Sequence, residues 1–339
     1  MDAPIKVGII RCDTHGAYFA PLMAPHDPLK LQRPADLDSN PPYSWMCGGA
    51  HFYFYHNYAN PRAMTVETVE GFEIVKVWDE HRVAAEALSE VMDSHPRVCT
   101  SFEQVSDGVD LVLIGDCNGD GSDHLEHATP GLKKGVATYI DKPLANSVAD
   151  VKKILALSKE CGAPVFSGSI LRHIPGAAHF ARRMGEIGGA SSGTISNGSG
   201  GNVAGLVHAI SLAQAVFGNG ISQVHASGPG EMGMMHLAWS EREDRPSAGV
   251  TLHPAGQSWH CSIHVAAFGP EGGILAHNVI NDWYFPYGAA NILKLVKKMV
   301  LTGAVDDSMN DMIEAIAVIE AGRLSYREGG RAVKVSEVQ

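Results

Sequence analysis

The sequence predicts an α/β protein in which a doubly wound parallel sheet is followed by a second α/β domain with an open, mostly antiparallel sheet. From Ile5 to Ser167, short apolar runs rich in β-branched residues alternate with helical segments. That alternation is typical of a parallel sheet with right-handed crossovers. From Gln223 to Tyr284, apolar and polar residues alternate in short segments, which indicates an antiparallel sheet with one solvated face.

In the first part, strands are expected at 5–10, 72–79, 110–115, 136–140 and 164–167. Helices are expected at 17–23, 83–92, 124–134 and 148–161. Residues 24–63 are rich in Pro, Asp, Asn and aromatic residues and lack periodicity. Such an insertion is a functional loop or lid, or a surface excursion at an oligomer interface.

In the second part, a Gly/Ser-rich alternating segment spans 190–201, and helices are expected at 177–184, 205–217, 289–301 and 308–326. We therefore predict a Rossmann-like first domain over 1–168 and a substrate and oligomerisation domain over 169–339, with the last helix packing back on the first domain. Because the wide alternating sheet must hide one face, we expect a homo-oligomer that forms through it.

The composition excludes several classes of protein. The chain has 339 residues, enough for two domains, and a formal net charge of −11, which argues against a nucleic-acid partner. Neither an apolar run long enough to span a bilayer nor a signal peptide is visible, so no membrane partner and a cytoplasmic location are expected. The six cysteines show no CxxC spacing, which favours reduced thiols. The 17 histidines are a high count, so a metal site is one of the alternatives.

The motif Asp141-Lys142-Pro143 directly follows the apolar run 136–140. A lysine at the carboxyl edge of a parallel sheet lies where such folds bind ligands, and the proline after it stops the strand. We therefore predict that Lys142 is catalytic or orients a substrate. The alternative is a lysine paired structurally with Asp141 or with a loop carbonyl.

With these parts in this order, the chain resembles the glucose–fructose oxidoreductase / inositol dehydrogenase / MocA (Gfo/Idh/MocA) family. The resemblance covers nearly the whole chain and rests on the opening strand, the second strand ending in Asp79, His124 eleven residues before Gly135, Asp141-Lys142-Pro143, Gly168 to Arg172, Gly205-Leu206-Val207-His208, and Ala289 to Val333. It implies a dinucleotide-binding domain, an open sheet that often makes oligomers, and oxidation or reduction of a carbohydrate-like substrate, a sugar or cyclitol, with NAD or NADP.

The resemblance also implies roles for single residues. Lys142 would contact the reacting hydroxyl and His208 would transfer a proton. The aspartates expected four residues before and three residues after that histidine are Ala204 and Ser211 here, so a hydrogen-bonded core histidine is the alternative. Substrate-side positions are taken by Arg172, His173 and Tyr284.

The nucleotide-binding loop departs from the family pattern. Arg11 and Asp13 stand where the first two fingerprint glycines are expected, and Gly16 remains. A side chain there blocks the close approach of a diphosphate to the backbone. The charge of Asp13 adds repulsion, since two like charges about 4 Å apart cost roughly 4 kcal/mol at an effective dielectric near 20. We therefore expect weak or absent NAD(P) binding, unless Arg11 pairs with a phosphate or with Asp13.

Other acids follow the strands of the first domain. Asp79 fits the ribose-binding acid and would favour NAD over NADP, although it would equally serve as a helix N-cap. In the loop 115–124, Asp116 and His124 are predicted beside the cofactor. Carboxylates and imidazoles at neighbouring strand ends also suit Zn, Mn or Fe, and the candidates for a divalent metal are Asp13, His15, Asp120 and His124. Asx-turns in Gly-rich loops are the alternative.

Within the insertion, His51 and His56 lie among aromatic residues. They line a sugar site or pack the insertion on the domain below. Three classes of function therefore stay open: an NAD(P)-dependent oxidoreductase acting on a sugar or cyclitol, a non-redox sugar-active enzyme (lyase, hydrolase or epimerase) with or without a divalent metal, and a ligand-binding or regulatory protein that has lost the chemistry.

Overall fold

The structure is a computed structural model of the chain. It describes residues 3–32, 49–116, 119–197, 202–231, 233–240, 244–254 and 262–339. Two compact units are present. The first contains Met1–Lys142, Asp150–Ser167 and Ala289–Asp306, and the second contains Pro143–Ala149, Gly168–Gly288 and Asp307–Gln339.

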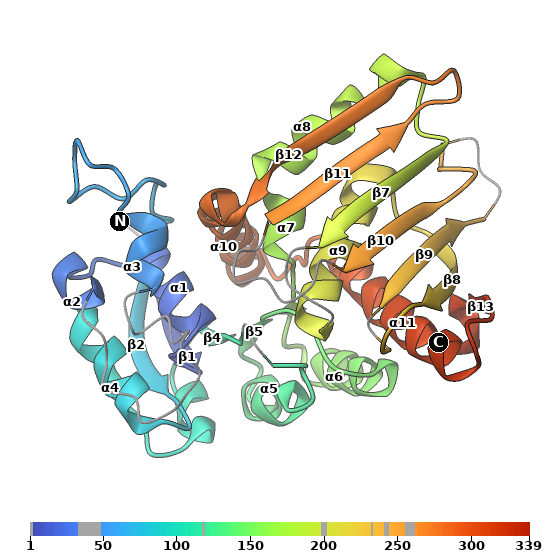
Figure 1. The fold of residues 1–339 in the computed structure, drawn as a ribbon. Coiled ribbons are helices and arrows are strands. Elements are labelled where there is room, and N and C mark those ends of the chain that lie inside the picture. The colour runs from blue at the N-terminus through green and yellow to red at the C-terminus, as the bar shows by residue number, and fades with distance from the viewer. Residues whose placement is uncertain are drawn as a thin grey trace. The chain divides into compact units, whose positions relative to one another are not determined.

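The first unit is built on a six-stranded parallel sheet (Figure 1). Its strands are β1 Ile5–Ile10, β2 Phe72–Trp78, β3 Arg97–Val98, β4 Leu111–Ile114, β5 Ala137–Ile140 and β6 Val165–Phe166. They lie in the order β3-β2-β1-β4-β5-β6, which is the order of a Rossmann fold. The order reverses between β1 and β4, and the crevice at the carboxyl ends of such strands is where these folds bind ligands. The predicted doubly wound sheet is confirmed.

The helices of this region follow the predicted pattern closely. They are α1 His15–Met23, α4 Arg82–Val91, α5 His124–Lys133, α6 Val148–Cys161 and α10 Phe285–Thr302. The first of them begins two residues before the predicted start, and α10 begins four residues before its predicted start. Strand β3 and the 3-10 helix η2 Phe102–Ser106 were not predicted, because two to five residues are too few to show a periodicity.

The insertion is more regular than predicted where the structure describes it. It contains α2 Pro28–Gln32 and α3 Gly49–Phe54, so the prediction of irregular chain is wrong there. Residues 33–48 lie outside the described residues. The ring of Phe54 stacks on Tyr18 with centroids 5.0 Å apart, and His51 stacks on Tyr55 at 4.9 Å. These contacts favour the packing interpretation of His51.

The second unit is built on a seven-stranded sheet in the order β12-β11-β7-β10-β9-β8-β13. Its strands are β7 Ser192–Asn197, β8 Ile221–Ser227, β9 Met234–Trp239, β10 Val250–Pro254, β11 Ser262–Phe268, β12 Ile274–Asn281 and β13 Val333–Lys334. β7 and β10 are parallel and the other neighbouring pairs are antiparallel. The predicted open, mostly antiparallel sheet is therefore confirmed.

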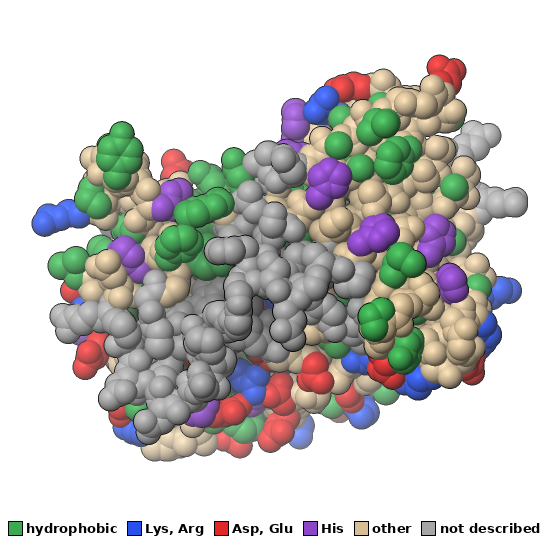
Figure 2. Space-filling model, in the orientation of Figure 1, with side chains coloured by type: hydrophobic (Ala, Val, Ile, Leu, Met, Phe, Trp, Pro, Cys, Tyr) green, Lys and Arg blue, Asp and Glu red, His purple; other side chains and the backbone are tan. Residues whose placement is uncertain are grey.

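Helices pack on this second sheet. They include α8 Pro175–Arg182, which contacts β12, α9 Val203–Phe217, which contacts β7, and α11 Ser308–Arg327, which contacts β8. Short elements complete the unit: α7 Ile170–His173, η3 Arg183–Ile187, η4 Asp282–Tyr284 and η5 Val335–Glu337. Figure 2 shows histidine side chains over the sheet, and His225 of β8 is the cross-strand neighbour of His236 of β9. The face of the sheet that carries these histidines is thus the polar face that the alternation of apolar and polar residues predicts.

Burial accounts for the regularity of the parallel sheet. Every residue of β4 and β5 is buried, and each large apolar side chain buried in this way contributes about 1.5–3 kcal/mol. Strands covered on both faces are mostly apolar, which is why they read as nearly continuous apolar runs. Among the described residues, no helix is long and apolar enough to cross a membrane.

Candidate functional site

Two non-glycine residues in the turn between β1 and α1 have backbone conformations that glycine favours. Arg11 and Thr14 have φ values of 66° and 57°, in the left-handed region that glycine favours. A Cβ added to Gly16 would lie 2.0 Å from the Arg11 carbonyl oxygen, so this position accepts only glycine. Each non-glycine residue in such a conformation costs about 1–3 kcal/mol. The turn therefore persists because contacts around it hold it.

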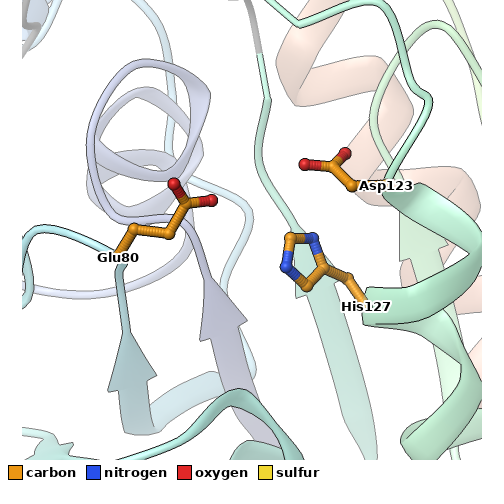
Figure 3. A group of neighbouring side chains, drawn as sticks. All are labelled: Glu80, Asp123 and His127. Carbon is orange, nitrogen blue, oxygen red and sulfur yellow. The ribbon is translucent and has the colours of Figure 1, made fainter.

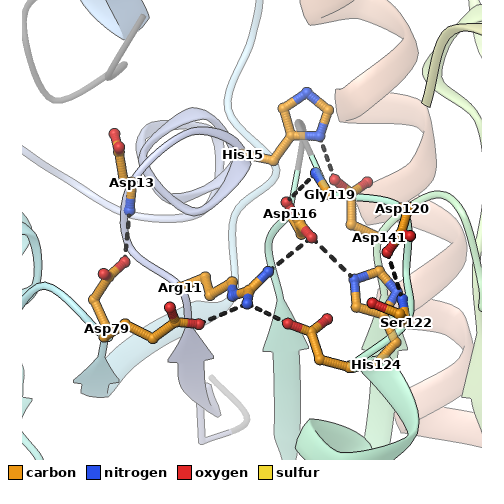
Figure 4. Close-up of polar contacts among 12 residues, drawn as sticks. Arg11, Asp13, His15, Asp79, Asp116, Gly119, Asp120, Ser122, His124 and Asp141 are labelled. Atoms are coloured by element: carbon orange, nitrogen blue, oxygen red, sulfur yellow. Dashed lines mark hydrogen bonds and ion pairs between the residues drawn. The ribbon is translucent and has the colours of Figure 1, made fainter. Parts of the chain in front are cut away.

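Three carboxylates surround the Arg11 side chain (Figure 4). Its Nη1 donates to Asp116 Oδ2 at 2.8 Å, and its Nη2 donates to Glu80 Oε1 at 2.6 Å and to Asp123 Oδ2. Burial alone would lower the pKa of Arg11, but these carboxylates outweigh it and raise that pKa. A side chain at the first glycine position thus connects the loops that follow β1, β2 and β4.

Asp79 joins the β1–α1 turn to the end of β2. Its Oδ2 accepts hydrogen bonds from the backbone N–H groups of Cys12 at 2.7 Å and Asp13 at 3.1 Å, and its Oδ1 accepts one from His81 at 2.8 Å. Burial raises the pKa of Asp79, and the three N–H donors oppose this shift. Helix α4 begins at Arg82 with His81 at its N-cap, so the alternative of Asp79 as that N-cap is wrong. Both carboxylate oxygens are engaged by main-chain groups of this site.

The loop after β4 is folded around Asp116. Its Oδ1 accepts from the Gly119 backbone N–H at 2.9 Å, and its Oδ2 lies 3.5 Å from His124 Nε2. Burial alone would raise the pKa of Asp116, but contacts with His124 and Arg11 outweigh it and hold that pKa well below its usual value. The carboxylate is therefore ionised at neutral pH.

The Asp-Lys-Pro segment lies at the end of β5. His15 Nδ1, at the start of α1, is paired with Asp141 Oδ2, and the Tyr139 hydroxyl donates to Asp141 Oδ1 at 3.3 Å. Lys142 is only 2% exposed. Buried lysines are rare, and they are retained where a partner or a function requires them.

The remaining metal candidates take part in local contacts. The Asp13 side chain accepts from the Thr14 backbone N–H at 2.9 Å, and Asp120 accepts from the Ser122 N–H at 3.0 Å. The second contact has the form of an Asx-turn.

The residues predicted on the substrate side belong to the second unit. His208, on α9, is buried, and its Nδ1 lies 2.7 Å from the Ser169 hydroxyl. Arg172 pairs with Asp311, while Tyr284 is exposed and its ring lies 6.4 Å from that of Tyr287. His173 ends helix α7. Sequence reasoning missed Ser169, because nothing local marks a serine as the partner of a histidine 39 residues away.

Within the part of the chain that the structure describes, two groups of side chains have the spacing of metal ligands. In one, Glu80, Asp123 and His127 each offer a ligand atom, and these atoms lie within 4.8 Å of one another (Figure 3). Asp116, Asp123 and His124 form the other. Of the predicted metal candidates, His124 belongs to one of these groups. Glu80 and His127 were missed, although the spacing from Asp123 to His127 places both on one side of the first turn of α5.

A cavity of about 290 Å³ lies beside Asp79 and Glu80, at the ends of β2 and β3. Trp78, Cys99 and Thr100 also line it. The strand order defines the class, a Rossmann-fold protein, with this cavity and the buried Lys142 at the carboxyl edge of its sheet.

One protein family model matches part of the chain. Residues 46–169 match the Gfo/Idh/MocA family model, described as an oxidoreductase family with an NAD-binding Rossmann fold. The match covers less than half of the chain, contains Lys142, and begins after the β1–α1 turn. The resemblance to the Gfo/Idh/MocA family predicted from the sequence is therefore confirmed, with an atypical nucleotide-binding loop outside the matched segment.

Solved structures show the same fold over nearly the whole chain. GenD2 from gentamicin A biosynthesis, in complex with NAD, is 15% identical, with 98% of this chain and 97% of that chain covered and a TM-score of 0.69. A myo-inositol dehydrogenase from Corynebacterium glutamicum is 16% identical, with 98% of each chain covered and a TM-score of 0.67. An oxidoreductase from Agrobacterium radiobacter, with NAD+, L-tartaric acid and magnesium, is 12% identical, with 99% and 100% covered and a TM-score of 0.67. No curated protein matches the sequence.

Proposed function

We propose that the chain is an NAD(P)-dependent oxidoreductase that acts on a hydroxyl group of a sugar or cyclitol. The observation that carries this proposal is the buried Lys142 directly after β5, in a segment that matches an NAD-binding oxidoreductase family. Similar folds in proteins named as a myo-inositol dehydrogenase and as an NAD complex support it.

The side chains suit the adenosine and nicotinamide ends of a dinucleotide better than they suit its diphosphate. Asp79 and the cavity beside it suit an adenosine, and Lys142 suits the reacting end. At the diphosphate position, Arg11 and its three carboxylates carry one positive and three negative charges, a net formal charge of −2. That charge does not fit an anionic group. We therefore expect weak binding, with NAD preferred over NADP because a carboxylate repels a 2′-phosphate.

The dinucleotide would supply the hydride acceptor. We assign the contacts with the reacting hydroxyl group of the substrate to two side chains of the protein. The Lys142 ammonium donates a hydrogen bond to the oxygen of that hydroxyl, and His208 receives the proton that the hydroxyl loses. The Ser169 hydroxyl, 2.7 Å from His208 Nδ1, is a positioning group that fixes the orientation of the ring.

Titration of NAD(H) and NADP(H) by calorimetry, with turnover of cyclitols and pyranoses followed by nicotinamide absorbance, tests the proposal. Lys142→Met should lower kcat by roughly 10²–10³-fold, the range for loss of a hydrogen-bond donor to an oxygen that gains negative charge in the reaction. The exposed Lys152 on α6 provides the control Lys152→Met, which should change nothing. Absence of binding at millimolar dinucleotide together with absence of turnover would refute the proposal.

A non-redox enzyme with a divalent metal is the second candidate. The observation that favours it is the pair of carboxylate and imidazole groups at the carboxyl edge of the sheet. Metal analysis of the purified protein, with product analysis of the same substrates in the absence of nicotinamide, separates the two candidates. Turnover that needs a metal and no dinucleotide would favour the second.

A further inference from the structure

We propose that Glu80, Asp123 and His127 bind a divalent cation of the Mn²⁺ or Zn²⁺ class. One ligand atom from each lies within 4.8 Å of the others, a separation that a single ion can bridge. Two carboxylates and one imidazole form a mixed oxygen and nitrogen set, which suits these ions. Glu80 comes from the loop after β2, whereas the other two flank the start of α5.

His127 is the observation that points to a ligand. The residue is only 5% exposed, and its Nδ1 is buried without a hydrogen-bond partner among the described residues. A buried polar atom without a partner costs free energy, and a bound ion would remove that cost. The ring packs against Trp78 and Phe102 at centroid distances of 5.8 and 5.0 Å. Figure 3 shows its nitrogen-bearing side facing the space between Glu80 and Asp123.

Arg11 holds the carboxylates of Glu80 and Asp123 in place through one oxygen of each. Its Nη2 takes one oxygen of each, Glu80 Oε1 and Asp123 Oδ2. Each carboxylate has a second oxygen for an ion, and an outer hydrogen bond of this kind is typical of ligating carboxylates. Arg11 and the three carboxylates that surround it have a net formal charge of −2, which a divalent cation would neutralise. The Glu80 side chain is 53% exposed, so an ion can reach the site from solvent.

The neighbouring group around Asp116 is the weaker candidate. It shares Asp123 with the first group. Asp116 already accepts from Arg11 Nη1 and from the Gly119 N–H, and it lies 3.5 Å from His124. A cation there would have to displace these contacts.

A cation at this site would have a consequence for the dinucleotide. Glu80 and Asp123 both touch Arg11, which stands at the first position of the glycine fingerprint. A bound divalent ion would bring the net formal charge of this cluster from −2 to zero. Mn²⁺ should therefore raise the affinity for NAD, and this step rests on the proposed function.

The site is tested with Mn²⁺ alone, added to the full chain after treatment with EDTA. Electron paramagnetic resonance and calorimetry should show one Mn²⁺ per chain. Glu80→Gln and His127→Phe should each weaken Mn²⁺ affinity at least about tenfold. The exposed Glu80 makes its variant safe for folding, and phenylalanine keeps a ring between Trp78 and Phe102. The nearby exposed residues give matched controls, Glu86→Gln and His81→Gln, which should bind as the unmodified chain does.

Absence of stoichiometric Mn²⁺ binding by the unmodified chain would overturn the site, as would unchanged affinity in Glu80→Gln. The titration of NAD with and without Mn²⁺ is a separate arm. If Mn²⁺ binds as expected and NAD affinity does not rise, the site stands and its link to the dinucleotide is wrong. Dinucleotide turnover without any Mn²⁺ binding would leave the proposed function intact and overturn this site.

Discussion

Arg11 Nη1 donates to Asp116 Oδ2 over 2.8 Å, so a side chain at a glycine position ties the turn after β1 to the loop after β4. Asp79 makes the corresponding connection between the end of β2 and the same turn, through the backbone of Cys12 and Asp13. In this way the carboxyl edge of the sheet is held by its own side chains. Four predictions follow from this arrangement and from the substrate-side pair of His208 and Ser169.

Arg11→Met should destabilise the fold by about 2–4 kcal/mol, because it leaves three neighbouring carboxylates without their shared cation. Urea unfolding at pH 7 measures the loss. Arg82→Met is the control, since Arg82 makes an exposed pair with Glu86 that contributes at most about 0.5 kcal/mol. Equal stability of the two variants would contradict a structural role for the Arg11 cluster.

Asp116→Asn should change how stability depends on pH. The pKa of Asp116 is lowered in the folded chain. Its ionised form therefore stabilises the fold above the unfolded pKa of about 4, and this contribution is lost as the pH falls further. Urea unfolding from pH 7 to pH 3 should show a steeper acid loss in the unmodified chain than in the variant. Parallel curves would contradict the assignment.

Asp13→Gly and Asp13→Asn should both strengthen NAD binding, by roughly three- to tenfold, because each removes a negative charge beside the diphosphate position. The comparison separates charge from space. Equal gains in the two variants indicate repulsion, and a gain in glycine alone indicates steric blocking. Calorimetry at fixed ionic strength provides the affinities, and weaker binding in both variants would count against the expected diphosphate position.

Ser169→Ala should lower kcat about tenfold and leave KM nearly unchanged, because it removes the hydroxyl that holds His208 Nδ1. Ser169→Thr keeps the hydroxyl and should restore most of the rate. Ser158→Ala, which removes a hydrogen bond from the Ser158 hydroxyl on α6 to the Ala163 carbonyl, is the control. If the threonine variant is as slow as the alanine variant, Ser169 does not act through its hydroxyl.

Most of the fold could be predicted because its signals are local. The apolar runs that became β1, β4 and β5 are buried on both faces, so burial shows directly in the sequence. Helix α6 runs from Val148 to Cys161, as its periodicity predicts. Very short elements such as β3 carry no such signal, because two residues cannot show a period.

The candidate site was predictable only in part. Three of its residues lie at or just after the ends of predicted strands: Asp79, Asp116 and Lys142. Because parallel strands end at the same edge of a sheet, their positions at the carboxyl edge could be predicted. Glu80 and His127 were missed because each is an ordinary polar residue in its own segment. They become neighbours only when the loop after β2 meets the start of α5.

The sequence by itself determined the α/β class, the order of strands and helices, and the absence of two fingerprint glycines, because periodicity and residue type are properties of short segments. Only the tertiary structure decided what replaces those glycines. The guanidinium of Arg11 contacts Asp116 and Asp123, which are more than 100 positions away in the chain. A long flexible side chain can pair with any of several acids. The acids that it contacts depend on how the parallel strands bring their loops to one edge of the sheet, and no local sequence pattern predicts this.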